Sequence, residues 1–446
     1  MPREVAVLVA VAVAVAVGFG VVAPAIPEFA RSFGVGKTAA GAVISAFAFM
    51  RFVSALGGGK LVDAFGERII LSTGIAIVAV STGLAGLAQN YEQLLILRGV
   101  GGVGSAMFTV AASSLLFRVV DGGNRGRATG LFQSGFLIGG LLGPLAGGFL
   151  TDYSLRLPFY VYAVSLIAAG SIGAVFLRSA ARRDIDPSTG VGGGSSAASP
   201  DRSPTAAEKV ATPSLGAEGE PSAASPDRSP AAADEVATTL LSEAFAHRAY
   251  RAAVIVNFAT GWALFGVRMS LIPLYVTEAM EQRVVWVGVG FLCSSLAQAG
   301  SLVFAGRFVD RVGRRPAMVI GSLVVALSLL SLAVSTALPM FLLAMVASGV
   351  GGAFIGTAPG AVVGDVMKGR GGKVVAVFQM ASDAGAVVGP LIAGWLADSI
   401  SFSAAFAASA AVLFAATWTS WRMPETLAAA SPRYPDSTIE GEVQQQ

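Results

Sequence analysis

Two stretches of the chain decide the fold: GKLVDAFGER at residues 59–68 and GRFVDRVGRRP at residues 306–316. Each is a short, charged segment with glycines, and each lies between two long apolar runs. Asp63 in the first stretch corresponds to Asp310 in the second, 247 residues later. We interpret both stretches as loops between hydrophobic helices. A loop that occurs twice, at matching places in two halves, indicates a duplicated membrane protein.

The composition supports a membrane environment for most of the chain. Of its 446 residues, 54% are hydrophobic and only 13% are charged, whereas a soluble domain carries about 25% charged residues. An α-helix needs about 20 apolar residues to cross a bilayer. The first apolar run is too long for a signal peptide, so we expect it to remain as the first helix. The sequence predicts an all-α membrane protein with twelve transmembrane helices at residues 5–28, 38–58, 69–89, 92–118, 127–150, 158–178, 250–275, 285–305, 315–336, 339–364, 374–397 and 402–422.

The distribution of basic residues predicts the orientation, because Lys and Arg are enriched in cytoplasmic loops. If both termini are cytoplasmic, 23 of the 30 Lys and Arg residues lie on that side and four lie outside. The other three, Arg51, Arg98 and Arg268, lie within predicted helices. We therefore expect both termini in the cytoplasm.

A segment rich in Pro, Ser, Ala and Gly separates the two sets of six helices. Within it, SAASPDRSP at residues 196–204 recurs 26 residues later, at 222–230. Such a segment has too little apolar surface to offset the entropy cost of ordering, so we expect a disordered cytoplasmic linker. A short binding motif within it is the alternative. The predicted units are a six-helix bundle at 1–178, the linker at 179–246, a second six-helix bundle at 247–422 and a cytoplasmic tail at 423–446.

Further repeats and two glycine-rich motifs connect the chain to a known family. FQ at residues 132–133 recurs at 378–379, an interval of 246 residues. The stretches at 59–68 and 306–316 resemble the signature of the major facilitator superfamily. LRGVGGVG at 97–104 and GGLLGPLAGG at 139–148 resemble two signatures of its twelve-helix drug:proton antiporters. The resemblance covers both six-helix halves and implies two pseudo-symmetric bundles with a substrate cavity between them.

The resemblance gives the two duplicated stretches a gating role on the cytoplasmic side. It implies that Asp63 caps the N-terminus of a helix in the opposite half, which we expect to be the helix at 374–397. It also implies that Arg68 pairs with Asp121. Charges that only set the topology are the alternative. The first copy has Ala64 and Glu67 where the family commonly has basic residues, which puts one ion pair in doubt. The predicted gating residues are Gly59, Asp63, Gly66, Arg68 and Asp121 in the first half, and Gly306, Asp310, Arg311, Gly313 and Arg314 in the second.

The antiporter glycine motif places small residues along one helix face. Gly135, Gly139, Gly143 and Gly147 recur every four residues, and small residues let helices approach closely in lipid. We interpret this face as a site of simple tight packing or as a surface on which the two halves slide. The two interpretations do not exclude each other. Pro144 is expected to bend this helix because it removes a backbone hydrogen bond. The predicted motif residues are Gly139, Gly143, Pro144, Gly147 and Gly148.

Charged residues inside the predicted helices are candidates for coupling transport to protons. A charge in the membrane costs about 2.5–3.5 kcal/mol on insertion scales, so it usually faces a cavity or a partner. The resemblance implies proton coupling for Arg98. Asp383 is the one acidic residue well inside a predicted helix, and burial would let its carboxyl bind and release a proton near neutral pH. A structural partner for a basic group is the alternative for Asp383. Arg51 could instead extend toward the membrane surface, and Arg268 could either do the same or face the cavity.

Several apparent motifs do not support other functions. GVGGVG at 99–104 fits a dinucleotide-binding pattern but lies inside a predicted membrane helix. The sole histidine, His247, and the sole cysteine, Cys293, have no cluster of metal-ligating residues around them. The sequence predicts no enzyme, no cofactor, no metal and no nucleic-acid partner.

The sequence therefore predicts a secondary active transporter in the plasma membrane, most simply a monomer that exports a small organic compound in exchange for protons. Uptake or uniport of a metabolite is one alternative, and a transporter-like membrane receptor is another. Few charges inside the membrane suit a neutral, cationic or amphiphilic substrate better than a polyanion. The candidate cavity residues are Phe19, Gln133, Asn257, Trp262, Phe265 and Gln379.

Overall fold

The structure is a computed structural model that describes residues 3–119, 125–183, 241–367 and 372–427. The predicted repeat in the linker and Asp121 lie outside the described residues. No β-strand occurs in the described ranges. The helices of the first half are α1 (Arg3–Val22), α2 (Ala25–Arg31), α3 (Lys37–Phe65), α4 (Glu67–Gly86), α5 (Tyr91–Val119), α6 (Arg125–Tyr153) and α7 (Leu157–Arg183).

The second half begins with a crossing made of several short segments. These are α8 (Leu241–Ala246), α9 (Arg248–Thr260), the wider π-helical turns η3 (Gly261–Val267) and η4 (Tyr275–Ala279), and α10 (Arg268–Leu274) between them. The remaining helices are α11 (Val285–Arg311), α12 (Arg314–Val334), α13 (Leu338–Val366), α14 (Gly372–Ser399) and α15 (Phe402–Trp421). Within the described residues, ten spans are long and apolar enough to cross a membrane. Helices α6 and α7 occupy the places predicted for crossings five and six.

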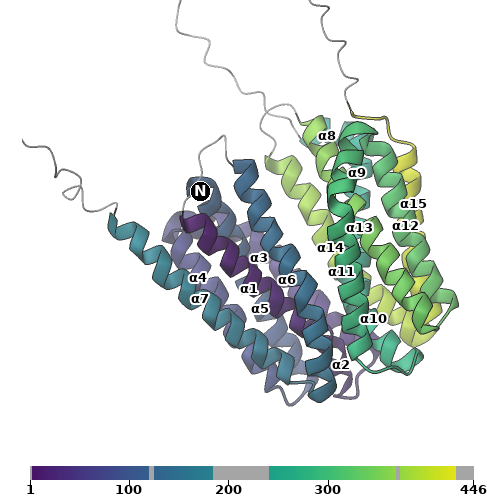
Figure 1. The fold of residues 1–446 in the computed structure, drawn as a ribbon, viewed down its shortest axis with the longest axis horizontal. Helices are drawn as coiled ribbons and strands as arrows, with labels where there is room; N and C mark the ends of the chain where they lie inside the picture. The colour runs from purple at the N-terminus through teal and green to yellow at the C-terminus, as the bar shows by residue number, and fades with distance from the viewer. Residues whose placement is uncertain (1–2, 120–124, 184–240, 368–371, 428–446) are drawn as a thin grey trace, which may run out of the picture.

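Two hydrophobic cores divide the helices into two bundles. One core is built from α1 to α7 and the other from α8 to α15 and its C-terminal end, with Leu274 of α10 as the member that packs into the first core. Figure 1 shows the two bundles side by side, close together near α2 and α10 and farther apart at the end that carries the N-terminus. We call the end with the N-terminus the termini side and the opposite end the far side. This arrangement confirms the predicted fold of two six-helix bundles.

The two duplicated stretches are not the loops that the sequence predicted. Helix α3 continues through the first stretch to Phe65, and α11 continues through the second to Arg311. The prediction was wrong because the apolar residues between the charges extend each helix by almost two turns. What separates the helices is a glycine in a backbone conformation that side chains disfavour: φ is +81° at Gly66 and +135° at Gly313.

Two helix pairs join the bundles at the far side, and each joint is a contact between a glycine and a proline-containing helix. Gly288 of α11 lies against Pro144 of α6, where a Cβ would be 2.5 Å from the proline carbonyl oxygen. Gly41 of α3 lies in the same way against Pro390 of α14. Because Gly41 and Pro144 of the first half match Gly288 and Pro390 of the second, the two joints are related by the pseudo-symmetry of the chain.

Candidate functional site

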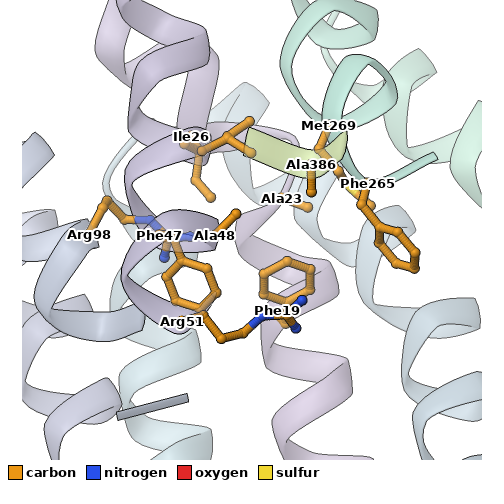
Figure 2. Close-up of a pocket in the computed structure, with 11 residues that line it drawn as sticks. Phe19, Ala23, Ile26, Phe47, Ala48, Arg51, Arg98, Phe265, Met269 and Ala386 are labelled. Carbon is orange, nitrogen blue, oxygen red and sulfur yellow. The ribbon is translucent and has the colours of Figure 1, made fainter. Parts of the chain in front are cut away.

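A cavity lies between the bundles, next to the far-side contacts. It encloses about 580 Å³, open solvent included. Its walls come from both halves: α1, α2, α3 and α5 on one side, and η3, α10 and α14 on the other. Figure 2 shows Arg98, Phe47 and Arg51 with Phe19 on one wall and Phe265, Met269 and Ala386 on the other. A cavity with walls from two bundles changes shape when the bundles move, as a transport site must.

The glycine-rich motif of α5 positions Arg98. Gly102 packs against the backbone of Phe47, and Gly104 packs against the carbonyl of Gly74, so α5 lies close to both α3 and α4. This close packing places the Arg98 guanidinium over the ring of Phe47, 4.5 Å from its centroid. The residue is only 3% exposed, and its Nε atom has no hydrogen-bond partner. The motif glycines therefore hold a buried, unpaired cation at the cavity wall.

An ion pair crosses between the bundles at the same cavity. Arg51 of α3 donates a hydrogen bond to Asp383 of α14. Phe47 and Arg51 are four residues apart on α3, which places both side chains on the face toward the cavity. Sequence reasoning placed Arg51 below Arg98 in importance, although an arginine within a membrane helix is itself a signal for a buried partner. The structure brings Arg51, Arg98 and Asp383 to one region.

The far side is closed by a polar cluster that joins the first half to the second. Asp398, at the end of α14, accepts hydrogen bonds from the N–H groups of Lys37 and Thr38 at the start of α3, each at 2.8 Å. The Thr38 hydroxyl adds a third bond at 2.7 Å. A carboxylate at a helix N-terminus satisfies free N–H groups and interacts favourably with the helix dipole. The far-side cluster consists of Glu28, Arg31, Lys37, Thr38, Thr277, Glu278 and Asp398.

Two further contacts of the cluster involve α2, the short helix that follows α1. Glu28 of α2 accepts a hydrogen bond from the Thr277 hydroxyl at 2.7 Å, and Arg31 pairs with Glu278 at 2.7 Å. Sequence reasoning missed Glu28 because it ended the first helix at that residue. In the structure the helix breaks at Pro24 and resumes as α2 up to Arg31. The prolines around residue 24 were the available signal.

The pseudo-symmetric position on the far side carries a second ion pair. Asp152 at the end of α6 lies 3.0 Å from Arg283, just before α11, without the alignment of a hydrogen bond. Asp152 matches Asp398, and Arg283 matches Lys37, both at an interval of 246 residues. Each half therefore supplies an aspartate that pairs with a basic residue near the start of a helix in the other half.

On the termini side, the described residues show no contact between Asp63 and the start of α14. Asp63 is exposed, and it makes no hydrogen bond or ion pair with any described residue. Gly59 and Gly306 lie inside α3 and α11 rather than in loops. The Nε atom of Arg68 is buried without a partner, and its predicted partner Asp121 lies outside the described residues.

The departure from the family pattern at Glu67 has a structural explanation. Glu67 pairs with Arg118 at 3.0 Å in the first half, and Arg314 pairs with Asp365 at 3.0 Å in the second. Both residues of the first pair are 247 positions before those of the second, so the ion pair occurs twice with its charges exchanged. Both pairs lie within one bundle. Sequence reasoning noticed the acidic residue but not the compensating Arg118.

The second copy has further contacts at the start of α12. Asp310 of α11 lies 3.6 Å from Arg314 of α12, across the break at Gly313. Arg311 is exposed at the end of α11. Glu425, after α15, accepts hydrogen bonds from the N–H groups of Arg314 and Arg315. Although burial favours the neutral carboxyl, these and two further N–H donors hold the pKa of Glu425 below its ordinary value.

The glycine face of α6 packs within its own bundle, not between the bundles. Gly139, Gly143 and Gly147 contact Ala16, Val17 and Val21 of α1, respectively. The expectation that this face forms a sliding surface between the halves is therefore wrong, because the helix turns Pro144 and Gly148 instead toward α11. The glycine face is therefore a site of tight packing within the first bundle. The contact with the second bundle is made by the residues that directly follow Gly143 and Gly147, which are Pro144 and Gly148.

The remaining cavity candidates are dispersed. Phe19 and Phe265 line the cavity, and Phe265 is 56% exposed there. Asn257 donates to the carbonyl of Phe378 within the second half. Trp262 is buried and donates to Ser409 on α15, so the structure does not place it at the cavity. Gln379 is exposed outside the cavity lining, and Gln133 lies on α6, where its side chain is not described.

The fold and this site define a membrane transporter: two helical bundles, a cavity between them and charged contacts that close one end. Comparison with known protein families identifies the family of transporters to which the chain belongs. The model of the Major Facilitator Superfamily matches residues 8–292 and 269–436, and the chain belongs to this superfamily. It is thus a multi-pass membrane transporter of the major facilitator fold. No group of three or more His, Cys, Asp or Glu side chains in the described part of the chain could hold a metal ion.

Curated relatives match one part of the chain. It is 27% identical over 160 residues to the quinolone resistance protein NorA of Staphylococcus aureus, which is 36% of this chain and 41% of NorA. It is 29% identical over 161 residues to the multidrug resistance protein 1 of Bacillus subtilis, again 36% of this chain and 41% of the relative. The matched region therefore spans less than half the length of these relatives.

Solved structures match nearly the whole chain in fold. A bacterial homologue of the human lysosomal transporter Spinster, in an inward-facing and unoccupied conformation, superposes with a TM-score of 0.69 at 14% identity and covers 94% of this chain and 96% of the other. The human organic anion transporter MFSD10 superposes with a TM-score of 0.60 at 16% identity and covers 94% of this chain and all of the other.

Proposed function

We propose that the protein exports small organic compounds from the cytoplasm across the plasma membrane in exchange for protons, by alternating access. The observation that carries the proposal is the ion pair between Arg51 and Asp383. It joins the two bundles at the cavity and contains a carboxyl group that a proton can neutralise. The names of the curated relatives, which describe quinolone and multidrug resistance, support export.

The orientation follows from the basic residues. Most of the Lys and Arg residues in the described part of the chain lie on the termini side, and cytoplasmic loops are enriched in Lys and Arg, so the termini side is cytoplasmic. The far-side cluster then closes the cavity toward the outside. The bundles diverge toward the termini side (Figure 1), so this conformation is the one that receives substrate from the cytoplasm.

Protonation of Asp383 supplies the coupling step. The ionised carboxylate attracts the Arg51 guanidinium, and both groups are partly shielded from water at the cavity. A proton on Asp383 removes one charge of the pair and weakens the link between α3 and α14. A proton that enters from outside thus changes the relative stability of the two orientations, which is what couples a proton gradient to transport.

The gates at the two ends of α3 and α14 alternate. On the far side, Asp398 at the end of α14 caps the start of α3. On the termini side, Asp63 lies near the end of α3, and the resemblance implies that it caps the start of α14. Only one of these caps forms at a time, because the bundles rock about the cavity. Among the described residues Asp63 has no partner in the present conformation, which is consistent with a termini side that is open.

Cell-based export tests this function directly. The protein is expressed in cells that lack their own exporters, and a panel of toxic compounds and metabolites is screened for resistance. We expect resistance to a subset of amphiphilic compounds that disappears when a protonophore collapses the proton gradient. Protonophore-insensitive flux would indicate uniport, and saturable ligand binding without flux would indicate a receptor. Either result would contradict the proposal.

A further inference from the structure

The charged residues within the membrane-spanning helices give the cavity region a positive balance. Away from the helix ends, the described residues of this kind are Arg51, Arg98, Arg268 and Asp383. Asp383 is paired with Arg51, which leaves Arg98 and Arg268 without a carboxylate. Each of the two unpaired guanidinium groups lies instead over an aromatic ring: Arg98 over Phe47 at 4.5 Å and Arg268 over Phe291 at 4.9 Å.

Arg98 is the one of these two that lines the cavity. Guanidinium carries five N–H donors, and no described residue accepts a hydrogen bond from Arg98. The titratable group that acts on it electrostatically is the Tyr162 phenol of α7, which is ordinarily neutral near pH 7. The face of Phe47 stabilises the positive charge but leaves the donors unsatisfied. A buried charge in this state is costly unless a partner arrives.

Apart from Arg51, which is paired with Asp383, the rest of the cavity wall is apolar and suits a ring system. Phe19 and Phe47 lie with ring centroids 6.3 Å apart, and Phe265, Met269 and Ile26 complete the surface around them (Figure 2). Flat apolar groups pack well against such rings. The cavity therefore offers an apolar surface for the body of a ligand and one unpaired cation, Arg98, for a single polar group.

We propose that the transported compounds are amphiphilic organic anions, in which a ring-sized apolar body carries one carboxylate that binds the Arg98 guanidinium. The inference rests on the proposed transport function and names its substrate class. Carboxylate and guanidinium match in a two-bond geometry, and zwitterions that carry such a carboxylate belong to the same class. Among the neutral, cationic or amphiphilic substrates that the sequence favours, this proposal selects amphiphilic anions, because a cation would meet the uncompensated charge of Arg98.

Binding of three matched probes tests the inference without any proton gradient. The probes are 2-naphthaleneacetic acid, its primary amide and 2-(2-naphthyl)ethylamine, measured by microscale thermophoresis on the purified full chain in lipid nanodiscs. We expect the acid to bind at least about tenfold more tightly than the amide, since hydrogen bonds to charged groups reach that size. The amine should bind most weakly.

Variants assign the preference to Arg98. In Arg98→Gln the acid and the amide should bind equally. In Arg98→Lys part of the preference should remain, because the charge is kept but the planar fork is lost. Arg422→Gln is the matched control, since Arg422 also lies over an aromatic ring, Trp418 at 4.3 Å, but outside the cavity. It should retain the full preference.

Three results would overturn the inference: no detectable binding of the acid, equal binding of acid and amide by the unmodified protein, or a full preference in Arg98→Gln. If Arg98→Gln does not fold, an unchanged acid preference in Arg98→Lys has the same meaning. Because no gradient is applied, these outcomes are separate from failure of the export proposal, which would appear as acid binding without proton-driven flux.

Discussion

Removal of the Asp398 carboxylate should shift the protein toward the conformation that is closed on the termini side. Asp398 accepts three hydrogen bonds at the start of α3, at 2.7–2.8 Å. Loss of a helix cap costs about 0.5–2 kcal/mol. The side chain is 30% exposed, so solvent screening holds the electrostatic part near the lower end. Because this cap joins the bundles only when the far side is closed, we expect Asp398→Ala to change the ratio of the two conformations by about 2-fold to 5-fold.

Distances between spin labels can measure this ratio. The labels are placed on Lys60→Cys and Arg307→Cys, which lie exposed at the termini-side ends of α3 and α11. The native Cys293 is replaced by serine so that only these two sites are labelled. Double electron–electron resonance should show a larger short-distance fraction in Asp398→Ala. Asp365→Ala is the control, because Asp365 pairs with Arg314 within one bundle.

An unchanged distance distribution in Asp398→Ala would refute the reasoning. The same shift in Asp365→Ala would refute it as well, because a general loosening of the fold, rather than a gate, would then explain the result.

Three further predictions concern the joint between the bundles, the exchanged ion pair and the C-terminal cap. Gly288→Val should block transport and disfavour the far-side-closed state in the spin-label assay, because its Cβ would lie 2.5 Å from the Pro144 carbonyl oxygen. Gly300→Val is the control and should be neutral, because a Cβ at Gly300 points into open space. Glu67→Arg should lower the free energy of unfolding by about 1 kcal/mol or less, seen as a slightly lower melting temperature. Adding Arg118→Glu should restore the native melting temperature. A double variant that is less stable than Glu67→Arg alone would contradict the exchanged pair. Glu425 has a lowered pKa, so its contribution to stability should be complete above the ordinary carboxyl pKa of about 4.3 and should be lost as the pH falls through the lower folded value. Thermal unfolding at pH 3 to 6 should show this loss in the native chain and not in Glu425→Gln; identical pH profiles would argue against the cap.

The fold could be predicted from the sequence because the membrane restricts the choices. Runs of about 20 apolar residues can only be helices in a bilayer, and the repeat of residues 59–68 at 306–316 divides the chain into halves. The ends of helices were less predictable. The charged residues at 60–68 suggested a loop, but α3 continues to Phe65, since only Gly66 adopts a conformation that ends it.

The candidate site was predictable only in part, because partners across the two bundles are far apart in sequence. Arg98 and Asp383 stood out as charges within helices. The partner of Asp383 is Arg51, more than 300 residues away, and the apolar pattern around neither residue indicates that pairing. The same holds for Glu28, whose partner Thr277 lies in the other half. Contacts of this kind follow from how the bundles dock, which the hydrophobic pattern does not specify.

Transport by purified Asp383→Asn tests the central claim most directly. The native chain and the variant are reconstituted in proteoliposomes, and movement of a substrate identified in the resistance screen is followed with and without an imposed pH gradient. Thermal unfolding confirms that the variant is folded. We predict that the gradient accelerates transport by the native chain and has no effect on Asp383→Asn, which still binds substrate. Gradient-driven transport by Asp383→Asn at the native rate would contradict the claim that protonation of Asp383, in its pair with Arg51, couples the proton to transport.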